Sequence, residues 1–304
     1  MADTCWIGID IGGTNLRIGA IGRENEVTAF EKRSTPQIFY SMDAGGELVR
    51  LIRDFIGAYG LEGVVKGICV GVPATLNRER TVVLQAPNIR GLDGRNVVGL
   101  LRETFGVPVW LMKDVCTALF YDREKYHVPQ CELLLGIYIG TGIGNIICVN
   151  GKELIGRDGV AGELGHIPLT GSSELCGCGN TGCAEVTAGG MYLARLCETI
   201  FAPLPVSEIF NEKRNHPLIL QYLERLAGII ATEINILNPD YVILGGGVPA
   251  MKGFPMEILL ERIRSHTRKP YPEQGLQIIV AEDDEKKGVT GAVLYAKSRQ
   301  DKRE

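Results

Sequence analysis

Apolar residues recur along the chain in two alternating patterns, which predict strands and helices in turn. Short apolar runs bounded by turn residues are typical of buried strands. We expect strands at residues 5–10, 16–21, 27–32, 67–72, 107–112, 133–139, 144–149, 241–244 and 277–281. Apolar residues at helical spacing predict helices at 46–59, 96–105, 217–237, 256–268 and 288–297. This alternation indicates an α/β fold.

The opening pattern of the chain recurs near its middle. Residues 7–14 read Ile-Gly-Ile-Asp-Ile-Gly-Gly-Thr, and residues 136–142 read Gly-Ile-Tyr-Ile-Gly-Thr-Gly. Each segment is a strand that enters a glycine turn, and a second apolar run follows each turn. The second pair ends at Asn150-Gly151, a dipeptide that favours hairpin turns. We therefore expect two related domains, each opening with a glycine hairpin.

Composition and charge narrow the functional classes. The 304 residues are 45% hydrophobic and carry a formal net charge of −4, which excludes global disorder and gives no basic excess for nucleic-acid binding. No apolar run reaches the ~18–20 residues that a membrane helix needs. The first residues lack a basic, apolar leader. We expect a cytoplasmic protein without membrane or nucleic-acid partners.

Three glycine clusters follow apolar runs, at residues 10–14, 140–144 and 245–247. A tight turn alone would explain each cluster. The first two lead into a second strand rather than a helix, so they do not fit the dinucleotide-binding fingerprint, and no Gly-Lys-Ser/Thr sequence is present. Unshielded backbone N–H groups in such turns can bind phosphate oxygens. Two facing turns would hold a triphosphate. The Asp10 carboxylate would then lie next to this anion, which implies a bound Mg²⁺ between them.

Three of the nine cysteines, Cys176, Cys178 and Cys183, lie within eight residues, and His166 precedes them. Three thiolates and one imidazole form a closed, structural zinc set. A disulfide is the alternative, but it is disfavoured in a reducing compartment. Glu163 and Glu185 bracket the loop, either as solvated side chains or as groups held to bind a ligand. We expect the other six cysteines to be small buried thiols.

Together with Lys113-Asp114-Val115, these motifs resemble the ROK family of repressors, open reading frames and sugar kinases, from about Ile7 to Ala296. The resemblance implies two ribonuclease-H-like domains of the actin, hexokinase and Hsp70 type, with a cleft between them. We expect residues 1–115 and the returning helix 288–304 in one domain, and 116–287 with the zinc loop in the other. The family's repressors carry a DNA-binding segment before the first hairpin. Only nine residues precede Asp10, so we expect a kinase, and the family implies a homodimer.

The resemblance also assigns roles to residues. Asp114 would be the catalytic base, although it could equally cap a helix. His166 would serve both the zinc ion and the sugar. The sugar hydroxyls would be bound by Asn88, Lys113, Asp114, Glu163, His166 and Glu185. ATP and Mg²⁺ would be bound by Asp10, Gly12, Gly13, Thr14, Thr141, Gly142, Gly245, Gly246 and Gly247.

The expected substrate is an aldohexose that is phosphorylated on its 6-hydroxyl. Residues 71–74, 159–169 and 242–248 resemble family members that phosphorylate D-allose. Most family kinases have Asn where this chain has Lys113, a departure that puts glucose-type recognition in doubt. We expect D-allose to be converted to D-allose 6-phosphate. Glucose, fructose and N-acetylmannosamine remain alternative substrates, and a sugar-responsive regulator without activity is the alternative function.

Overall fold

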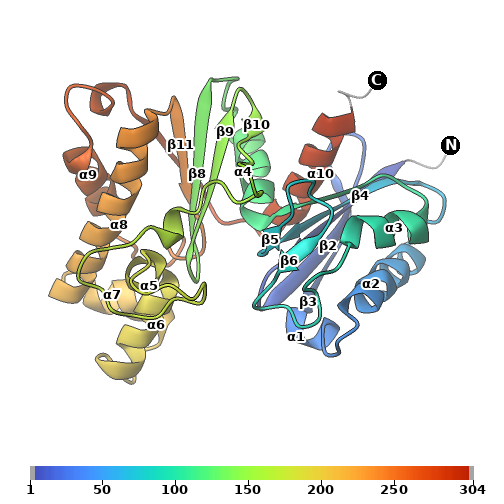
Figure 1. Ribbon diagram of the computed structural model, residues 1–304, viewed down its shortest axis with the longest axis horizontal. Helices are drawn as coiled ribbons and strands as arrows, with labels where there is room; N and C mark the ends of the chain where they lie inside the picture. Colours follow the sequence, from blue (N-terminus) through green and yellow to red (C-terminus); the bar gives the residue numbers. More distant parts are fainter. Residues whose placement is uncertain (1–3, 301–304) are drawn as a thin grey trace. The chain divides into compact units, whose positions relative to one another are not determined.

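The computed structural model describes residues 4–300, which form two compact units (Figure 1). The first unit holds residues 4–128, 155–161 and 284–300, and the second holds 129–154 and 162–283. The chain therefore leaves the first unit and returns to it twice.

The first unit is built on a five-stranded sheet in the order β3-β2-β1-β4-β7. Neighbours in the β3-β2-β1 meander are antiparallel, whereas β4 and β7 run parallel to β1. The strands are β1 (Cys5–Ile11), β2 (Asn15–Ile21), β3 (Val27–Ser34), β4 (Val65–Val72) and β7 (Val109–Lys113). A separate two-stranded ribbon pairs β5 (Thr75–Leu76) with β6 (Val83–Gln85).

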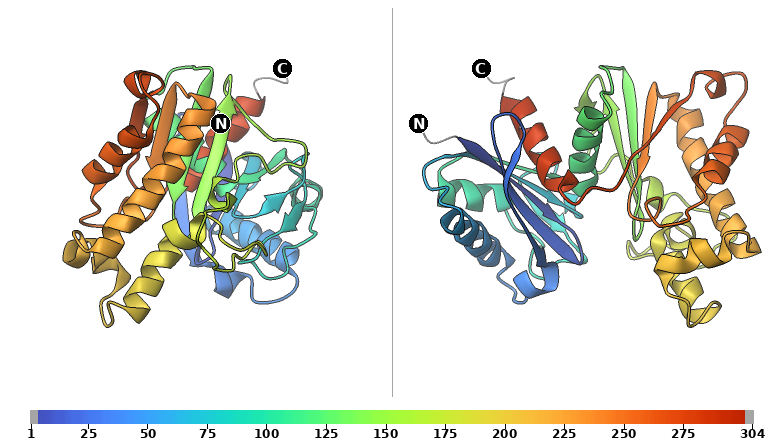
Figure 2. Two further views of the ribbon diagram at one scale, coloured as in Figure 1. Left: turned by 60° about the vertical axis from the view of Figure 1, so that its left-hand side comes forward. Right: turned by 180° about the vertical axis from the view of Figure 1, so that it is seen from behind.

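Helices cover both faces of this sheet (Figure 1). They are α1 (Thr35–Ile38), α2 (Ala44–Ala58), α3 (Val97–Phe105), α4 (Asp114–Lys125) and α10 (Lys287–Gln300). Helix α2 buries Leu48, Ile52 and Phe55 among the apolar side chains of β1 and β4, as its helical spacing predicts. Helices α4 and α10 pack against each other and against β1 and β4 (Figure 2).

The second unit repeats the same topology, with the sheet order β10-β9-β8-β11-β12. An antiparallel meander is again followed by two parallel strands. The strands are β8 (Leu133–Ile139), β9 (Ile143–Val149), β10 (Lys152–Glu153), β11 (Tyr241–Gly245) and β12 (Gln277–Val280). The repetition expected from the two glycine hairpins is confirmed, because both units follow one strand order.

The core of the second unit lies between this sheet and its helices. These are α5 (Glu185–Ala188), α6 (Gly190–Thr199), α7 (Ile209–Lys213), α8 (Pro217–Leu237) and α9 (Met256–His266), with 3₁₀ turns at Leu164–His166, Val206–Glu208 and Glu273–Gly275. Helix α8 places Tyr222, Leu226 and Ile230 in this core. It ends at Leu237, and the capping residue Asn238 adopts the left-handed conformation (φ 49°).

Each strand and helix expected from the apolar pattern is present within the described residues, and the α/β class is confirmed. The first unit, however, extends to Val128 instead of ending at residue 115, because α4 packs on α10 and β4. Residues 155–161 also belong to it, since Arg78 and Arg80 donate hydrogen bonds to the carbonyls of Arg157 (3.2 Å) and Gly159 (3.0 Å). Helix α10 covers 287–300, and residues 301–304 of the expected helix lie outside the described part of the chain.

The cysteines behave largely as expected. Cys5, Cys69, Cys116, Cys148 and Cys197 are buried, whereas Cys131 is half-buried, and none of the nine cysteines, all of which lie within residues 4–300, forms a disulfide. Between residues 4 and 300, no helix is both long and apolar enough to span a bilayer.

Candidate functional site

Asp114 lies where strand β7 becomes helix α4. Its carboxylate accepts a hydrogen bond from the N–H of Val115 (2.8 Å), and Lys113 occupies the N-cap position. Asp114 is therefore the first residue of the helix rather than its cap. Burial raises the pKa of this carboxyl group, while the Val115 N–H and the positive charge of Lys113 partly offset that effect. A carboxylate with a raised pKa is a better proton acceptor than a solvated one.

Asp10 lies near the end of β1, where it pairs with Arg17 (3.4 Å). Burial and the negative charge of Asp114 raise the pKa of Asp10 to about 6, against the opposing effect of Arg17. The start of helix α10 lies against this carboxylate. A Cβ atom added to Gly288 would lie only 2.6 Å from the Cβ of Asp10, so there is no room for a side chain at this position. The first unit thus holds two half-buried carboxylates that repel each other, an arrangement that favours a bound cation.

The first glycine turn joins β1 to β2. Gly12 N–H donates to the carbonyl of Asn15 (2.8 Å), and the Thr35 hydroxyl donates to the carbonyl of Gly12 (2.6 Å). Gly13 and Thr14 are exposed. Asn88 lies beside this turn: its Cβ is only 3.5 Å from the place that a Cβ on Gly13 would occupy. The expected phosphate turn and one expected sugar ligand are therefore neighbours.

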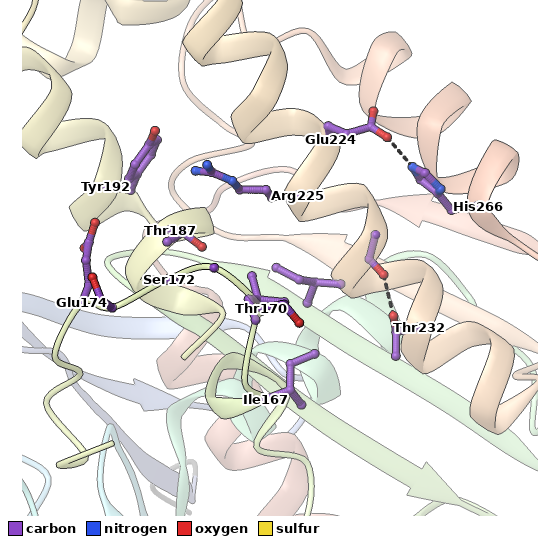
Figure 3. Close-up of a pocket in the computed structure, with 15 residues that line it drawn as sticks. Ile167, Thr170, Ser172, Glu174, Thr187, Tyr192, Glu224, Arg225, Thr232 and His266 are labelled. Carbon is purple, nitrogen blue, oxygen red and sulfur yellow. Dashed lines mark hydrogen bonds and ion pairs between the residues drawn. The ribbon is translucent and has the colours of Figure 1, made fainter. Parts of the chain in front are cut away.

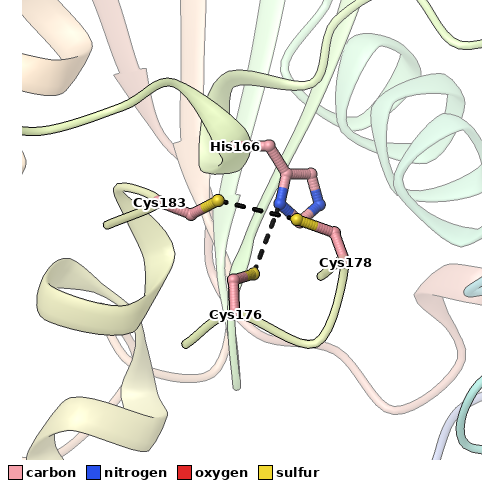
Figure 4. Close-up of side chains that lie close together, drawn as sticks. All are labelled: His166, Cys176, Cys178 and Cys183. Carbon is pink, nitrogen blue, oxygen red and sulfur yellow. Dashed lines mark hydrogen bonds between the residues drawn. The ribbon is translucent and has the colours of Figure 1, made fainter. Parts of the chain in front are cut away.

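Four side chains of the second unit converge on one point (Figure 4): His166, Cys176, Cys178 and Cys183, whose donor atoms all lie within 4.8 Å of one another. Cys178 Sγ is 3.6 Å from Cys183 Sγ, and Cys176 Sγ is 3.6 Å from His166 Nδ1. Tetrahedral zinc with Zn–S bonds near 2.3 Å requires sulfurs about 3.8 Å apart. The spacing and chemistry of this cluster therefore fit a closed zinc site.

The protonation of the thiols also bears on metal binding. Burial raises the pKa of Cys176 to about 12 and raises that of Cys183, whereas a backbone N–H from Asn180 lowers that of Cys178. A bound cation would supply the charge that keeps all three thiols ionised.

Glu163 and Glu185 lie on either side of the His166 ring. Glu163 Oε2 is 3.7 Å from Nε2, and Glu185 Oε1 is 3.7 Å from Nδ1. The Cys176 thiol also donates to Glu185 Oε1 (3.2 Å). Neither glutamate is simply a solvated side chain, and the expected sugar-binding carboxylates of this unit adjoin the Cys/His cluster.

The other two glycine clusters lie at strand ends in the second unit. Thr141 and Gly142 form the turn between β8 and β9, where the N–H of Gly140 donates to the carbonyl of Gly142 (3.0 Å). Gly245 is the last residue of β11, and Gly246 and Gly247 follow it. Gly246 has a positive φ (103°) and lies against Ile139 at the end of β8. Gly245–Gly247 therefore lie at the same edge of the sheet as the turn formed by Thr141 and Gly142.

The structure groups the expected residues by unit. Asp10, Gly12–Thr14, Asn88, Lys113 and Asp114 belong to the first unit, and the remaining expected residues belong to the second. The sequence analysis missed Arg17 and Gly288, which both contact Asp10. Arg17 could have been found from its position opposite Asp10 in the β1–β2 hairpin, but Gly288 carries no local signal.

A separate cavity of about 610 Å³ opens in the second unit between helix α8 and residues 167–174 (Figure 3). Glu224 on its wall is paired with His266 (2.6 Å) and Arg262 (2.8 Å). Arg225 points toward Tyr192 and lies over its ring, 5.6 Å from the ring centre. Among the described residues, none of those expected to bind sugar or ATP lines this cavity.

Comparison with known proteins gives relatives along nearly the whole chain. N-acetyl-D-glucosamine kinase of Salmonella paratyphi C is 28% identical over 279 residues, covering 86% of this chain and 89% of that protein. The ROK hexokinase structure of Thermus thermophilus is 27% identical, with a TM-score of 0.77 and coverage of 98% and 100%. A ROK transcriptional regulator homologous to the E. coli MLC protein has a TM-score of 0.81 at 23% identity, covering 98% of this chain and 78% of that one.

These structures confirm the fold of two related sheet-and-helix domains that the sequence predicted. The fold alone does not separate a kinase from a regulator, since both share it. The ROK family profile matches residues 6–299. The chain belongs to the ROK family.

Proposed function

We propose that the protein is an ATP-dependent hexose kinase that phosphorylates the 6-hydroxyl of its sugar. The observation that carries this proposal is Asp114, a half-buried carboxylate with a raised pKa at the carboxyl end of a parallel strand. A regulator that only binds sugar would need no such base. Relatives that are named as N-acetylglucosamine kinase and hexokinase support the same reaction class.

Asp114 would accept the proton of the 6-hydroxyl as that oxygen attacks the γ-phosphorus of ATP. General-base assistance of this kind contributes ~10²–10⁴-fold to the rate. The remaining work is the positioning of two reactants, because phosphoryl transfer requires little covalent chemistry from the protein. The residues that would orient the ring hydroxyls are Asn88, Lys113, Glu163, His166 and Glu185.

The glycine turns would bind the nucleotide. Gly12, Gly13 and Thr14 in the first unit and Thr141 and Gly142 in the second would donate N–H groups to phosphate oxygens, and Gly245–Gly247 would lie against the adenosine. Asp10 would hold Mg²⁺, which neutralises phosphate charge when bound. The repulsion between Asp10 and Asp114 supports a cation at this point.

We also propose that the four-residue Cys/His cluster holds one structural Zn²⁺ per chain. Its donor set is closed, so the ion would leave no position for water and would take no part in catalysis. Bound through Nδ1, it would fix the tautomer of His166, leaving Nε2 on the Glu163 side as the donor. The cluster would in this way orient a sugar-binding imidazole.

We propose D-allose as the preferred substrate. Allose differs from glucose in its configuration at C3, so discrimination depends on groups around that hydroxyl. Lys113 can only donate hydrogen bonds, unlike the amide that most family kinases have there. An unpaired polar group costs about 1–3 kcal/mol, or ~5–150-fold in kcat/KM. Some phosphorylation of glucose should therefore remain.

Measuring ADP release from ATP tests both the proposed kinase activity and the proposed sugar. The sugars to compare are D-allose, D-glucose, D-fructose, N-acetyl-D-glucosamine and N-acetyl-D-mannosamine. Allose should give the highest kcat/KM, and Lys113→Asn should move the allose-to-glucose ratio toward glucose. If another sugar gives the highest kcat/KM, the allose assignment fails and the hexose kinase remains. Sugar binding without ADP release would instead identify a regulator.

A further inference from the structure

The turn between β8 and β9 is held by the segment that carries Glu185. The N–H of Gly190 donates to the carbonyl of Gly140 (2.8 Å), and the N–H of Met191 donates to the carbonyl of Thr141 (2.9 Å). These bonds join the start of α6 directly to the backbone of the turn. Any displacement of one segment must therefore move the other.

Gly189 brings the two backbones into direct contact. An added Cβ on Gly189 would lie 2.7 Å from the carbonyl oxygens of both Glu185 and Thr141, and 3.0 Å from the Cα of Gly142. Cβ atoms do not approach other atoms this closely, so only glycine fits at this position. At Gly189 the backbone that follows α5 therefore touches the backbone of the turn directly.

The side chain of Glu185 reaches the same turn. Its Oε1 faces the Cys/His cluster, 3.2 Å from Cys176 Sγ and 3.7 Å from His166 Nδ1. Its Oε2 occupies the space where a side chain on Gly142 would begin: an added Cβ would overlap Oε2 and lie 3.2 Å from the carboxyl carbon. The carboxylate, only 17% exposed, thus fits between the cluster and the bare Cα of Gly142.

From these contacts we infer that Gly142 is a positioning residue for Glu185, and thereby for recognition of the hexose. The turn expected to bind phosphate also forms one wall of the pocket for a sugar-binding carboxylate. This inference rests on the proposed function, because it takes Glu185 as a ligand of sugar hydroxyls. It adds a role for Gly142 on the sugar side of the reaction.

The test is Gly142→Ala, with sugar affinity measured by calorimetry in the absence of nucleotide. The new methyl group meets the end of a flexible side chain, so the chain should fold while the carboxylate turns away. Loss of a charge-assisted hydrogen bond predicts a sugar Kd about 10- to 100-fold higher. Gly140→Ala is the matched control, since its added Cβ meets nothing within 4 Å; it should leave the sugar Kd unchanged.

The double variant Gly142→Ala/Glu185→Ala tests whether the effect passes through Glu185. Once the carboxylate is absent, the alanine at position 142 should add no further loss of sugar affinity. An unchanged sugar Kd in Gly142→Ala, or an equal additional loss in the Glu185→Ala background, would overturn the inference.

A crystal structure of Gly142→Ala keeps this test separate from the proposed function. If the wild-type protein binds no hexose, the proposed function fails, yet the electron density still shows whether the Glu185 carboxylate has left its place beside the turn. A displaced carboxylate supports the positioning role, whereas an unmoved one contradicts it.

Discussion

At the residue scale, the half-buried carboxylates of Asp10 and Asp114 have different expected roles although each influences the charge of the other. Asp114 is placed to accept a proton, and Asp10 is placed to bind a cation. Each role requires the ionised form, which burial opposes. The site is therefore built at a cost to the stability of the unit.

Asp114→Asn should remove the base while keeping the shape of the side chain. We expect kcat to fall at least ~10²-fold while the sugar Kd changes little, because the amide cannot take up the hydroxyl proton. In the wild type, kcat should rise with pH, and the midpoint should lie above the usual aspartate range because burial raises the pKa of Asp114. Single-turnover kinetics on both proteins measures this; a variant that keeps most of its kcat would disprove the assignment.

Asp10→Asn should lose activity but gain stability near neutral pH. The folded-state pKa of about 6 exceeds the ordinary value of 3.8, so the native state favours the protonated carboxyl and loses stability as pH rises through about 6. The amide does not ionise, so the free energy of unfolding at pH 7.5 should rise by about 1–3 kcal/mol, with a smaller gain at pH 4.5. Urea unfolding at both pH values measures the difference.

The control for this experiment is Asp54→Asn, which changes an exposed carboxylate on α2 of the same unit. At pH 7.5 it should change the free energy of unfolding much less than Asp10→Asn does. A stability gain for Asp10→Asn that is equal at both pH values would show that ionisation of Asp10 is not its cause.

At the scale of elements, the loop 166–183 has little regular structure, which makes the Cys/His cluster its main support. Removing one ligand should therefore disorganise the segment that leads to Glu185. The exposed Cys178 is the most informative position, because its replacement leaves the buried core untouched.

Cys178→Ser should reduce bound zinc from about one ion per chain to none and should also weaken sugar binding. Elemental analysis of the purified protein and sugar calorimetry provide the two measurements. Cys131→Ser, at a half-buried thiol of the same unit outside the cluster, should retain both properties. Active wild-type protein without metal would exclude the proposed zinc site.

The sequence predicted elements whose apolar residues follow one clear period, such as α2 and α8, because burial on one face leaves a visible stripe. The extent of helix α4 was not predicted, although Asp114 was a candidate helix cap. Asp122 of this helix is fully buried and forms an ion pair with Lys287 of α10 (2.9 Å). A charged residue therefore occupies a buried position at which the helical pattern would predict an apolar one. The pairing partner is 165 residues away, and no local pattern reveals it.

The candidate site likewise has some features that a local sequence pattern reveals and others that depend on tertiary packing. Motifs that are contiguous, such as the Cys/His loop and the glycine turns, could be recognised from spacing. The contact of Gly142 with Glu185 could not, since it depends on how α5 packs on the β8–β9 turn. Short elements such as α5 and α6 are glycine-rich at their junction and leave no periodic signal.

At the scale of the whole molecule, the first unit is assembled from distant parts of the chain. Helix α10 fills one face of its sheet with Val289, Ala292, Val293 and Ala296, all fully buried. A chain that stops at Asp283 lacks this layer, and the apolar face of β1 and β4 would be exposed to water.

We expect this truncated chain to keep a folded second unit and to lose the first. Hydrogen exchange provides the measurement: amides of β8, β11 and α8 should remain protected, while those of β1 and β4 should exchange rapidly. Adding a synthetic peptide of residues 284–304 should restore some of that protection. Protected β1 amides in the truncated chain alone would contradict the expectation.

The place of α10 beside β1 also sets an order of events on the ribosome. Strand β1 is synthesised first, but the helix that completes its layer emerges only after the entire second unit. Translation of the roughly 275 residues between Ile11 and Lys287 takes on the order of 15–55 s at ~5–20 residues per second. The unit that begins the chain is consequently the later one to finish folding, and its half-covered sheet is the surface that a nascent-chain chaperone would have to shield.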